Sequence, residues 1–187
     1  PFDQINFDEF DSIDVLVHLA AHSANVPYDS LENCLLYNLT MPLKMFKAAS
    51  NYGINKFLVT GSCFEYGISG LNYDKIPANA TLLPTQSYPA SKAAASIAFT
   101  QFARENNISL SLVRLFQIFG EGELNSRLYP SLKEKALSGE DFKMTKGEQI
   151  RDFMNVKDVA KTLLNEAKSL AKANSSIIKI QNIGSGK

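Results

Sequence analysis

The chain has 187 residues, 45% of them hydrophobic and 20% charged, which is enough to bury the core of one globular domain. Nineteen basic and nineteen acidic residues give a formal net charge of zero, which argues against a nucleic-acid or membrane-surface protein and favours a small-molecule partner. The two cysteines, Cys34 and Cys63, argue against a disulfide framework or a metal site and favour a reducing, cytoplasmic location. No apolar run spans a membrane and no signal peptide opens the chain, while its two ends suggest a piece of a longer protein.

The first sixty residues predict a strand, a helix and a second strand. Residues 1–12 are expected to form a helix or loop that leads into a buried strand over 14–19, a continuous apolar run rich in β-branched residues. Apolar positions with a helical period predict a helix over 29–52, which Gly53 ends. A second strand follows over 56–60, so this part reads as a βαβ unit.

The middle of the chain predicts a long loop, a helix and a third strand. Glycines and prolines punctuate the loop over 62–87, and a loop of that length inside a compact domain is usually functional. The helix covers 88–106 and the strand 109–116. Three strands with helical crossovers predict an α/β fold, a Rossmann-type doubly wound parallel sheet.

Beyond residue 120 the pattern changes and predicts part of a small substrate-binding lobe. The expected elements are a helix over 129–137 closed by Gly139, strands over 141–145, 149–156 and 177–180, and a helix over 158–173. We therefore assign 1–120 to the C-terminal part of a dinucleotide-binding domain, and 121–187 to the start of the lobe with a returning helix and strand. Ligands of open α/β sheets bind where the strands end, which is the edge that this lobe would cover.

Tyr88 and Lys92 stand four residues apart at the start of the second long helix, so they share one helix face. A cation about 4 Å from a phenol contributes up to about 4 kcal/mol at an effective dielectric constant of about 20. Since one pKa unit is about 1.4 kcal/mol, Lys92 is expected to lower the pKa of Tyr88 towards neutrality. The spacing is common at ordinary helix starts, so its context must decide.

Six segments supply that context because they occur in a known order. They are His18 to Ala21, Thr60 to Gly67, Tyr88 to Lys92, Arg114 to Gly120, Arg151 to Ala160, and Asn182 to Gly186. Together they resemble the extended short-chain dehydrogenase/reductase family, in particular its NAD-dependent epimerase/dehydratase group acting on nucleotide sugars. The resemblance covers nearly the whole chain. The family's glycine-rich turn is missing from residues 1–187, because it belongs upstream of Pro1. Residues 1–187 alone are therefore not expected to bind cofactor well.

The resemblance implies a set of site residues and a cofactor, NAD or NADP. The implied catalytic residues are Ser62, Tyr88 and Lys92. The implied cofactor-binding residues are Leu19, Ala20, Ala21, Ser23, Asn38, Thr60, Tyr88, Lys92 and Leu115. The implied substrate-binding residues are Ser62, Gln117, Arg127 and Arg151, and no metal is expected. In the implied mechanism Ser62 and Tyr88 reach the oxygen of a sugar carbonyl, the nicotinamide delivers hydride to its carbon, and Tyr88 supplies the proton.

Several of these positions also have simple structural interpretations. Ser62 could merely finish a strand, and Arg151 could pair with Asp152 instead of a phosphate. Gln117 stands where the family usually has asparagine, and its side chain is one methylene longer than the asparagine that would contact the substrate. Three residues are left outside the site: His18 as a core histidine, His22 as a loop residue and Arg114 as a structural ion-pair partner.

The residues after Ser62 narrow the choice of reaction. Family dehydratases follow the catalytic hydroxyl with an Asp-Glu acid/base pair, whereas this chain has Cys63 and Phe64, and strand alternation should point Glu65 elsewhere. The bifunctional epimerase-reductases that make GDP-fucose also need a downstream histidine, and no histidine follows His22. Two reactions remain. Reduction of a 4-keto-6-deoxy nucleotide sugar is our main expectation, and 4-epimerisation is the alternative.

A third interpretation is a non-catalytic relative that only binds dinucleotide. Loss of Tyr88 or Lys92 would mark such a protein, and both residues are present. The resemblance also implies a possible homodimer built from the helices over 29–52 and 88–106. The expected partner is a nucleotide sugar, with no nucleic acid and no membrane.

Overall fold

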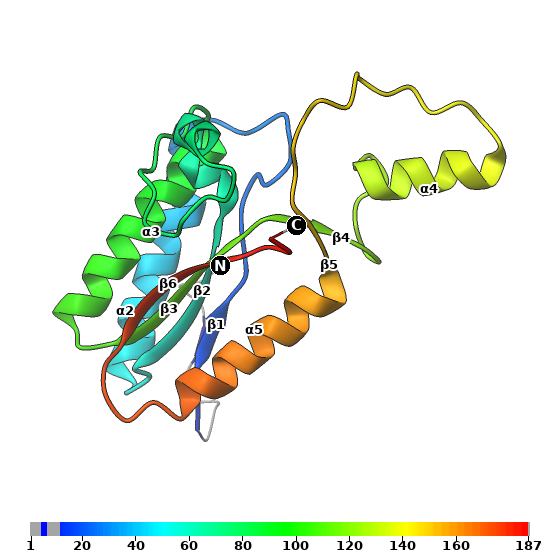
Figure 1. Ribbon diagram of the computed structural model, residues 1–187. Coiled ribbons are helices and arrows are strands. Elements are labelled where there is room, and N and C mark those ends of the chain that lie inside the picture. Colours follow the sequence, from blue (N-terminus) through cyan, green and yellow to red (C-terminus); the bar gives the residue numbers. More distant parts are fainter. Residues whose placement is uncertain (1–4, 7–11, 187) are drawn as a thin grey trace.

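The computed structural model describes residues 5–6 and 12–186, and a sheet of four parallel strands lies at its centre (Figure 1). The order in the sheet is β1 (Leu16–His18), β2 (Lys56–Ser62), β3 (Ser109–Leu115) and β6 (Ile178–Ile183). The two central strands, β2 and β3, are buried almost throughout, which explains their continuous apolar sequences. The predicted α/β fold with a parallel, Rossmann-like sheet is confirmed.

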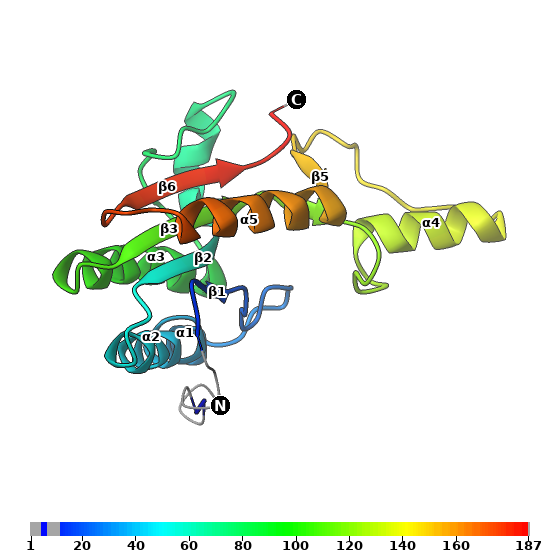
Figure 2. The same ribbon diagram turned by 90° about the horizontal axis from the view of Figure 1, so that it is seen from below.

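Helices cover both faces of this sheet, as the view from below shows (Figure 2). On one face lie α2 (Met41–Asn51) and α3 (Ser87–Glu105), and on the other lies α5 (Val156–Ala171). Side chains alternate along β2, so Phe57 and Val59 join the core formed with α2 and α3, whereas Leu58 packs with α5. The sheet is therefore the middle of three layers.

The helix predicted over 29–52 is present but irregular. It consists of α1 (Leu31–Leu35), a π-helical turn over Leu36–Thr40, and α2, and Gly53 ends it with a positive φ of 86°. Ser30 caps its start by accepting a hydrogen bond from the backbone N–H of Asn33 at 3.2 Å. Across residues 5–6 and 12–186, none of the helices has the length and apolar character that crossing a membrane requires.

The segment after β3 contains a second, two-stranded parallel sheet of β4 (Gln117–Phe119) and β5 (Phe153–Asn155). Between its strands the chain forms α4 (Leu128–Ser138), which projects away from the main sheet in both views. Gly139 ends α4 in the left-handed conformation, as predicted. From β5 the chain returns through α5 and β6 to the main sheet.

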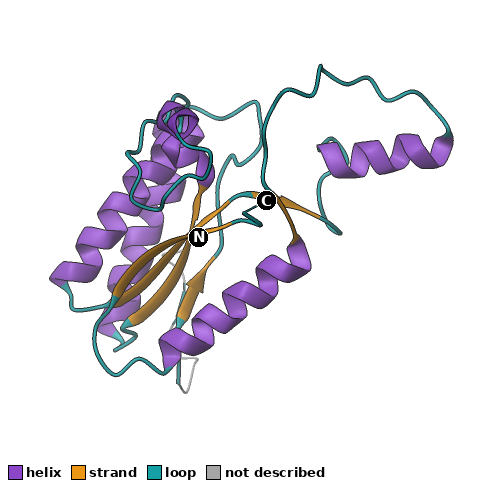
Figure 3. Cartoon of the chain, in the orientation of Figure 1, coloured by secondary structure: helices purple, strands orange, loops and turns teal. Residues whose placement is uncertain are grey.

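Two predictions for this part differ from the structure. The strand predicted over 149–156 is shorter, because only Phe153–Asn155 forms β5. The strand predicted over 141–145 is wrong, because the chain between α4 and β5 is irregular (Figure 3) and its side chains are largely exposed. The pairing of β4 with β5 was not predicted. The element expected over 1–12 falls mostly outside the described residues.

The loop predicted over 62–87 contains two short 3₁₀ helices, Cys63–Tyr66 and Ile68–Asn72. Gly67 joins them with a φ of 53°, and a Cβ at this position would lie 1.9 Å from the carbonyl oxygen of Leu83. Only glycine permits this close approach, so Gly67 holds the loop against its own return segment.

His18, the last residue of β1, gives a prediction about pH and stability. It is buried, and its ring packs edge-on against Phe46 at 5.5 Å. Burial, and secondly the charge of Lys92, lower the pKa of His18 from 6.5 to about 4. The unfolded chain therefore binds a proton between these values that the folded chain does not, so acid should cost about 2 kcal/mol of stability by pH 5.

Between pH 7.5 and pH 5, we expect the free energy of unfolding to fall by about 2 kcal/mol less in His18→Gln than in the unchanged chain. Urea unfolding at both pH values measures the difference. Equal pH dependence in the two proteins would show that His18 does not titrate as its burial implies.

Candidate active site

Ser62, Tyr88 and Lys92 lie together at the edge where the parallel strands end. Ser62 is the last residue of β2, and Tyr88 and Lys92 belong to the first two turns of α3. All three are buried, with at most 7% of each residue exposed. Tyr88 and Lys92 line a cavity of about 180 Å³, together with six other predicted site residues: Leu19, Ala21, Thr60, Leu115, Gln117 and Arg127.

The ammonium of Lys92 is held by the main chain of the sheet. Its Nζ donates a hydrogen bond to the carbonyl oxygen of Thr60 at 2.7 Å. Burial lowers the pKa of Lys92, while the negative charge of Glu65 acts in the opposite direction. This lysine therefore joins the start of α3 to the end of β2.

The pKa of Tyr88 differs from our expectation. Burial raises it to about 12, and a hydrogen bond with Ser62 only partly offsets that effect. The predicted lowering of the Tyr88 pKa towards neutrality by Lys92 is wrong, because desolvation of the phenolate outweighs the favourable interactions around it. Tyr88 is consequently a protonated phenol at neutral pH.

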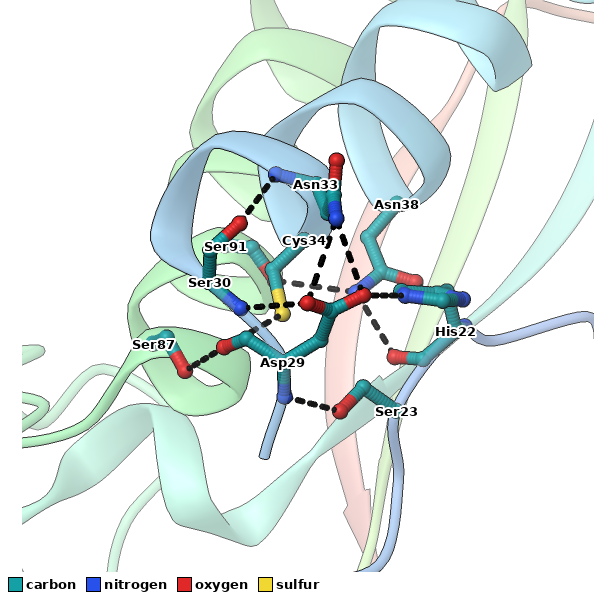
Figure 4. Close-up of polar contacts among 9 residues, drawn as sticks. All are labelled: His22, Ser23, Asp29, Ser30, Asn33, Cys34, Asn38, Ser87 and Ser91. Carbon is teal, nitrogen blue, oxygen red and sulfur yellow. Dashed lines mark hydrogen bonds and ion pairs between the residues drawn. The ribbon is translucent and has the colours of Figure 1, made fainter. Parts of the chain in front are cut away.

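Asn38 supports one wall of the cavity from behind. Its Oδ1 accepts the backbone N–H of His22 at 2.7 Å, and its Nδ2 donates to the carbonyl of His22 at 3.1 Å and to Ser91 Oγ at 2.9 Å (Figure 4). These contacts tie the segment after β1 to α3. They occupy the amide of a residue that is 2% exposed, so Asn38 shapes the wall formed by Leu19 to Ser23.

Asp29 organises the same region, and sequence reasoning missed it. Its carboxylate contacts His22 Nε2 at 2.8 Å and accepts hydrogen bonds from Asn33 and from the backbone of Ser30 (Figure 4). The contact with His22 is the main reason that the pKa of Asp29 is lowered. The carbonyl of Asp29 also accepts a hydrogen bond from Ser87 Oγ at 2.7 Å, directly before Tyr88. An aspartate beside the helix cap Ser30 was the available sequence signal.

Two further features of this loop bear on the site. Ser23 Oγ accepts the backbone N–H of Asp29 at 2.7 Å, so the predicted cofactor residue Ser23 is used within the loop. The ring of Tyr28 lies against that of Tyr88, with 5.4 Å between centroids. Tyr28 was not predicted, because nothing in its sequence neighbourhood distinguishes it.

The two predicted phosphate-binding arginines differ in their surroundings. Arg127 donates to Glu123 Oε1 and to Asn25 Oδ1, each at 2.8 Å, and so links the lobe to the loop after β1. Arg151 is exposed, and its Nη1 contacts the neighbouring carbonyl of Ile150 at 3.0 Å. Its charge acts on the thiol of Cys63, whose pKa burial raises to about 11.

Asp152, the alternative partner that we considered for Arg151, is engaged elsewhere. Its carboxylate accepts the backbone N–H groups of Ser185 and Gly186 at 2.6 and 2.7 Å. Its carbonyl accepts the backbone N–H of Gln117 at 3.0 Å. Gln117 thus stands at the start of β4 with its position fixed through Asp152, and it lines the cavity.

Arg114 and Glu65 form a buried ion pair beside the cavity. Arg114 Nε lies 2.7 Å from Glu65 Oε2, which confirms the structural interpretation of Arg114. Glu65 does point away from the cavity, as expected, but the reason we gave was wrong. The residue belongs to a 3₁₀ helix, not a strand, and its direction is set by Arg114 and by the backbone of Ser62.

Several known proteins are similar to this chain in sequence or in structure. The model of the NAD dependent epimerase/dehydratase family matches residues 3–184. A probable UDP-arabinose 4-epimerase 3 of Arabidopsis thaliana is 25% identical over 94% of this chain and 47% of its own length. A UDP-glucose 4-epimerase of Corynebacterium glutamicum is 25% identical over 91% of this chain and 55% of its own.

A solved structure of similar fold is a UDP-N-acetylglucosamine 4-epimerase from Methanobrevibacter ruminantium M1, in complex with UDP-N-acetylmuramic acid. It is 28% identical, with a TM-score of 0.78, and the match covers 93% of this chain and 56% of that one. The chain thus spans about half the length of the curated relatives that it matches. With its parallel sheet, its ordered motifs and a family match over almost all of its length, the chain belongs to the NAD dependent epimerase/dehydratase family.

Proposed function

We propose that this chain carries the catalytic residues of an NAD-dependent nucleotide-sugar 4-epimerase. The observation that carries the proposal is that Tyr88 and Lys92 line one cavity at the end of β2, the strand whose last residue is Ser62. The similarity to UDP-sugar 4-epimerases favours epimerisation over one-way reduction. Dehydration remains disfavoured, because Cys63 and Phe64 provide no acid/base pair beside Ser62.

The cavity suits the nicotinamide half of NAD. Leu19, Ala21 and Leu115 offer apolar or small walls against which a flat ring can lie. Lys92 and Thr60 supply polar groups at the same place. When bound, the nicotinamide supplies the acceptor and donor of hydride.

Tyr88 is the proposed proton carrier and Ser62 its partner at the sugar oxygen. Because the pKa of Tyr88 is about 12, the residue is ready to donate its proton to a 4-keto oxygen. To accept the proton of a 4-hydroxyl, Tyr88 must have a lower pKa in the complex with substrate and cofactor. Lys92, buried one turn further along α3, is a cation of this chain placed to lower it.

Arg151 and Arg127 are the proposed contacts of the substrate diphosphate, and Gln117 a contact of the sugar. A guanidinium offers a fork of donors that matches phosphate oxygens. Arg127 lines the cavity, and Arg151 carries an exposed guanidinium whose charge reaches Cys63 in the cavity wall. A UDP-sugar is the proposed substrate, because the relatives are UDP-sugar 4-epimerases. Dimerisation and a cytoplasmic location stay predictions from the sequence.

The role of Tyr88 can be tested by substitution. In the full-length protein supplied with NAD and a UDP-hexose, Tyr88→Phe should lower kcat by about 10² to 10⁴-fold, because proton transfer is lost. Tyr73→Phe is the matched control, since Tyr73 is 43% exposed and lies outside the cavity. Epimerisation at an unchanged rate in Tyr88→Phe would refute the mechanism.

Epimerisation and reduction differ in their use of cofactor. An epimerase turns over UDP-sugar with no net change in absorbance at the nicotinamide band, because hydride returns to the same carbon. A reductase consumes one reduced cofactor for each 4-keto sugar. Stoichiometric consumption with 4-keto-6-deoxy nucleotide sugars, and no epimerisation of UDP-sugars, would replace our proposal by the reductase that the sequence first suggested.

The phosphate role of Arg151 predicts a binding defect. Arg151→Ala should raise KM by about tenfold or more with a smaller change in kcat, as expected from the loss of a charge-assisted hydrogen bond. Arg104→Ala, an exposed arginine in the last turn of α3, should leave both constants unchanged. If Arg151→Ala binds UDP as tightly as the unchanged protein, Arg151 is not the phosphate contact.

A further inference from the structure

We propose that Glu65 is a positioning residue for Ser62, which it holds through the main chain without touching the substrate. The inference rests on the proposed function, because it matters only if the Ser62 hydroxyl acts on the sugar. It assigns a task to a buried carboxylate that the mechanism above does not use.

The first support is a reciprocal pair of hydrogen bonds. The backbone N–H of Ser62 donates to Glu65 Oε1 at 2.8 Å, and the backbone N–H of Phe64 donates to Ser62 Oγ at 3.2 Å. Together they form a capping box on the 3₁₀ helix Cys63–Tyr66. The hydroxyl of Ser62 thus has one lone pair occupied from the Phe64 side, which leaves its remaining capacity for Tyr88 and the sugar oxygen.

The second support is that the carboxylate itself is fixed from behind. Glu65 has no exposed surface, and its Oε2 accepts hydrogen bonds from Arg114 Nε and Ser96 Oγ, both at 2.7 Å. Arg114 is in turn held by the hydroxyl of Tyr66 at 3.1 Å and the carbonyl of Ala78 at 2.9 Å. Glu65 therefore links Ser62 to α3 and β3 through contacts that leave neither oxygen free.

The third support is the tight packing of the backbone at Gly61. A Cβ at this position would lie 2.5 Å from Glu65 Oε1 and 3.0 Å from Arg114 Cγ. The end of β2 thus runs directly over the ion pair. A change in the place of the carboxylate must therefore move the Gly61–Ser62 peptide, and with it the Ser62 hydroxyl.

An ion pair that only stabilises the core is the competing explanation. Buried pairs often contribute little net stability, and apolar replacements of similar volume are often tolerated. Stability alone therefore does not require a carboxylate here. An apolar residue at position 65 could fill the space, but it could not accept the N–H of Ser62.

Two substitutions of Glu65 separate the explanations. Glu65→Gln keeps an oxygen at the place of Oε1 and loses the charge, whereas Glu65→Asp keeps the charge and is one carbon too short to reach both Ser62 and Arg114. If Glu65 positions Ser62, Glu65→Gln should keep kcat within about threefold of the unchanged protein. Glu65→Asp should lower kcat by about 30 to 100-fold, since a misplacement of about 1 Å can lower a rate about 10²-fold. KM and NAD binding should change less than threefold in both.

A double-mutant cycle with Ser62→Ala then shows whether Glu65 acts through Ser62. In the Ser62→Ala background, Glu65→Asp should lower the residual kcat by less than about threefold, because the Ser62 hydroxyl that Glu65 positions is already absent. If Glu65→Asp does not fold, Arg114→Lys loosens the same carboxylate from its other side and serves in the cycle. Gln101→Ala, which removes an exposed hydrogen bond to Glu105 on the same helix, should leave kcat within about twofold.

The opposite results would overturn the inference. One is that the losses of kcat caused by Glu65→Asp and Ser62→Ala multiply independently in the cycle. The others are that Glu65→Gln lowers kcat as much as Glu65→Asp does, or that Glu65→Asp leaves kcat unchanged. Failure of the proposed function is a separate outcome, because the unchanged protein would then show no turnover that depends on Ser62.

Discussion

The hydrogen bond from Lys92 to the carbonyl of Thr60 fixes the first turns of α3 against the end of β2. A buried ammonium needs an acceptor, and the main chain of the sheet supplies one at a place that cannot move independently of the core. Ser62 lies two residues beyond that carbonyl, and Tyr88 lies one helical turn before that ammonium. The distance between the serine and the tyrosine therefore depends on this contact and on the packing of α3 on the sheet.

A second layer of polar residues surrounds the candidate site without lining it. Asn38 and Asp29 hold the segment after β1, while Glu65 and Arg114 lie behind the end of β2. Asn38, Glu65 and Arg114 are buried, and buried polar groups are costly unless their hydrogen bonds are satisfied. Each of the three bonds to a backbone group, of His22, Ser62 and Ala78 respectively. The segments that line the cavity are thus held by side chains from the π-helical turn Leu36–Thr40, from the 3₁₀ helix Cys63–Tyr66 and from β3.

Most of the main sheet could be predicted from the sequence, because buried parallel strands are continuous apolar runs and the long helices have clear periods and glycine stops. The order of the motifs likewise indicated that Ser62, Tyr88 and Lys92 meet. Other features depend on distant parts of the chain. Among the described residues no strand pairs with 141–145, and β4 pairs with β5.

The electrostatics of the site could be predicted least. The four-residue spacing predicted a lowered pKa for Tyr88 from the charge of Lys92, whereas desolvation of the buried phenol raises the pKa. Burial depends on the packed structure around the phenol, and a helix pattern does not report it. The direction of Glu65 was likewise decided by a partner 49 positions away, Arg114, whose approach no local pattern reveals.

Asp152 has a consequence for how the two sheets respond to a ligand. It follows Arg151 directly, its carbonyl holds Gln117 at the start of β4, and its carboxylate holds the backbone just beyond β6. A Cβ on Gly184 would lie 2.7 Å from this carboxylate, so the junction has no slack. If Arg151 holds the substrate diphosphate as proposed, a shift of this residue on binding would act directly on the start of β4 and on the backbone that follows β6.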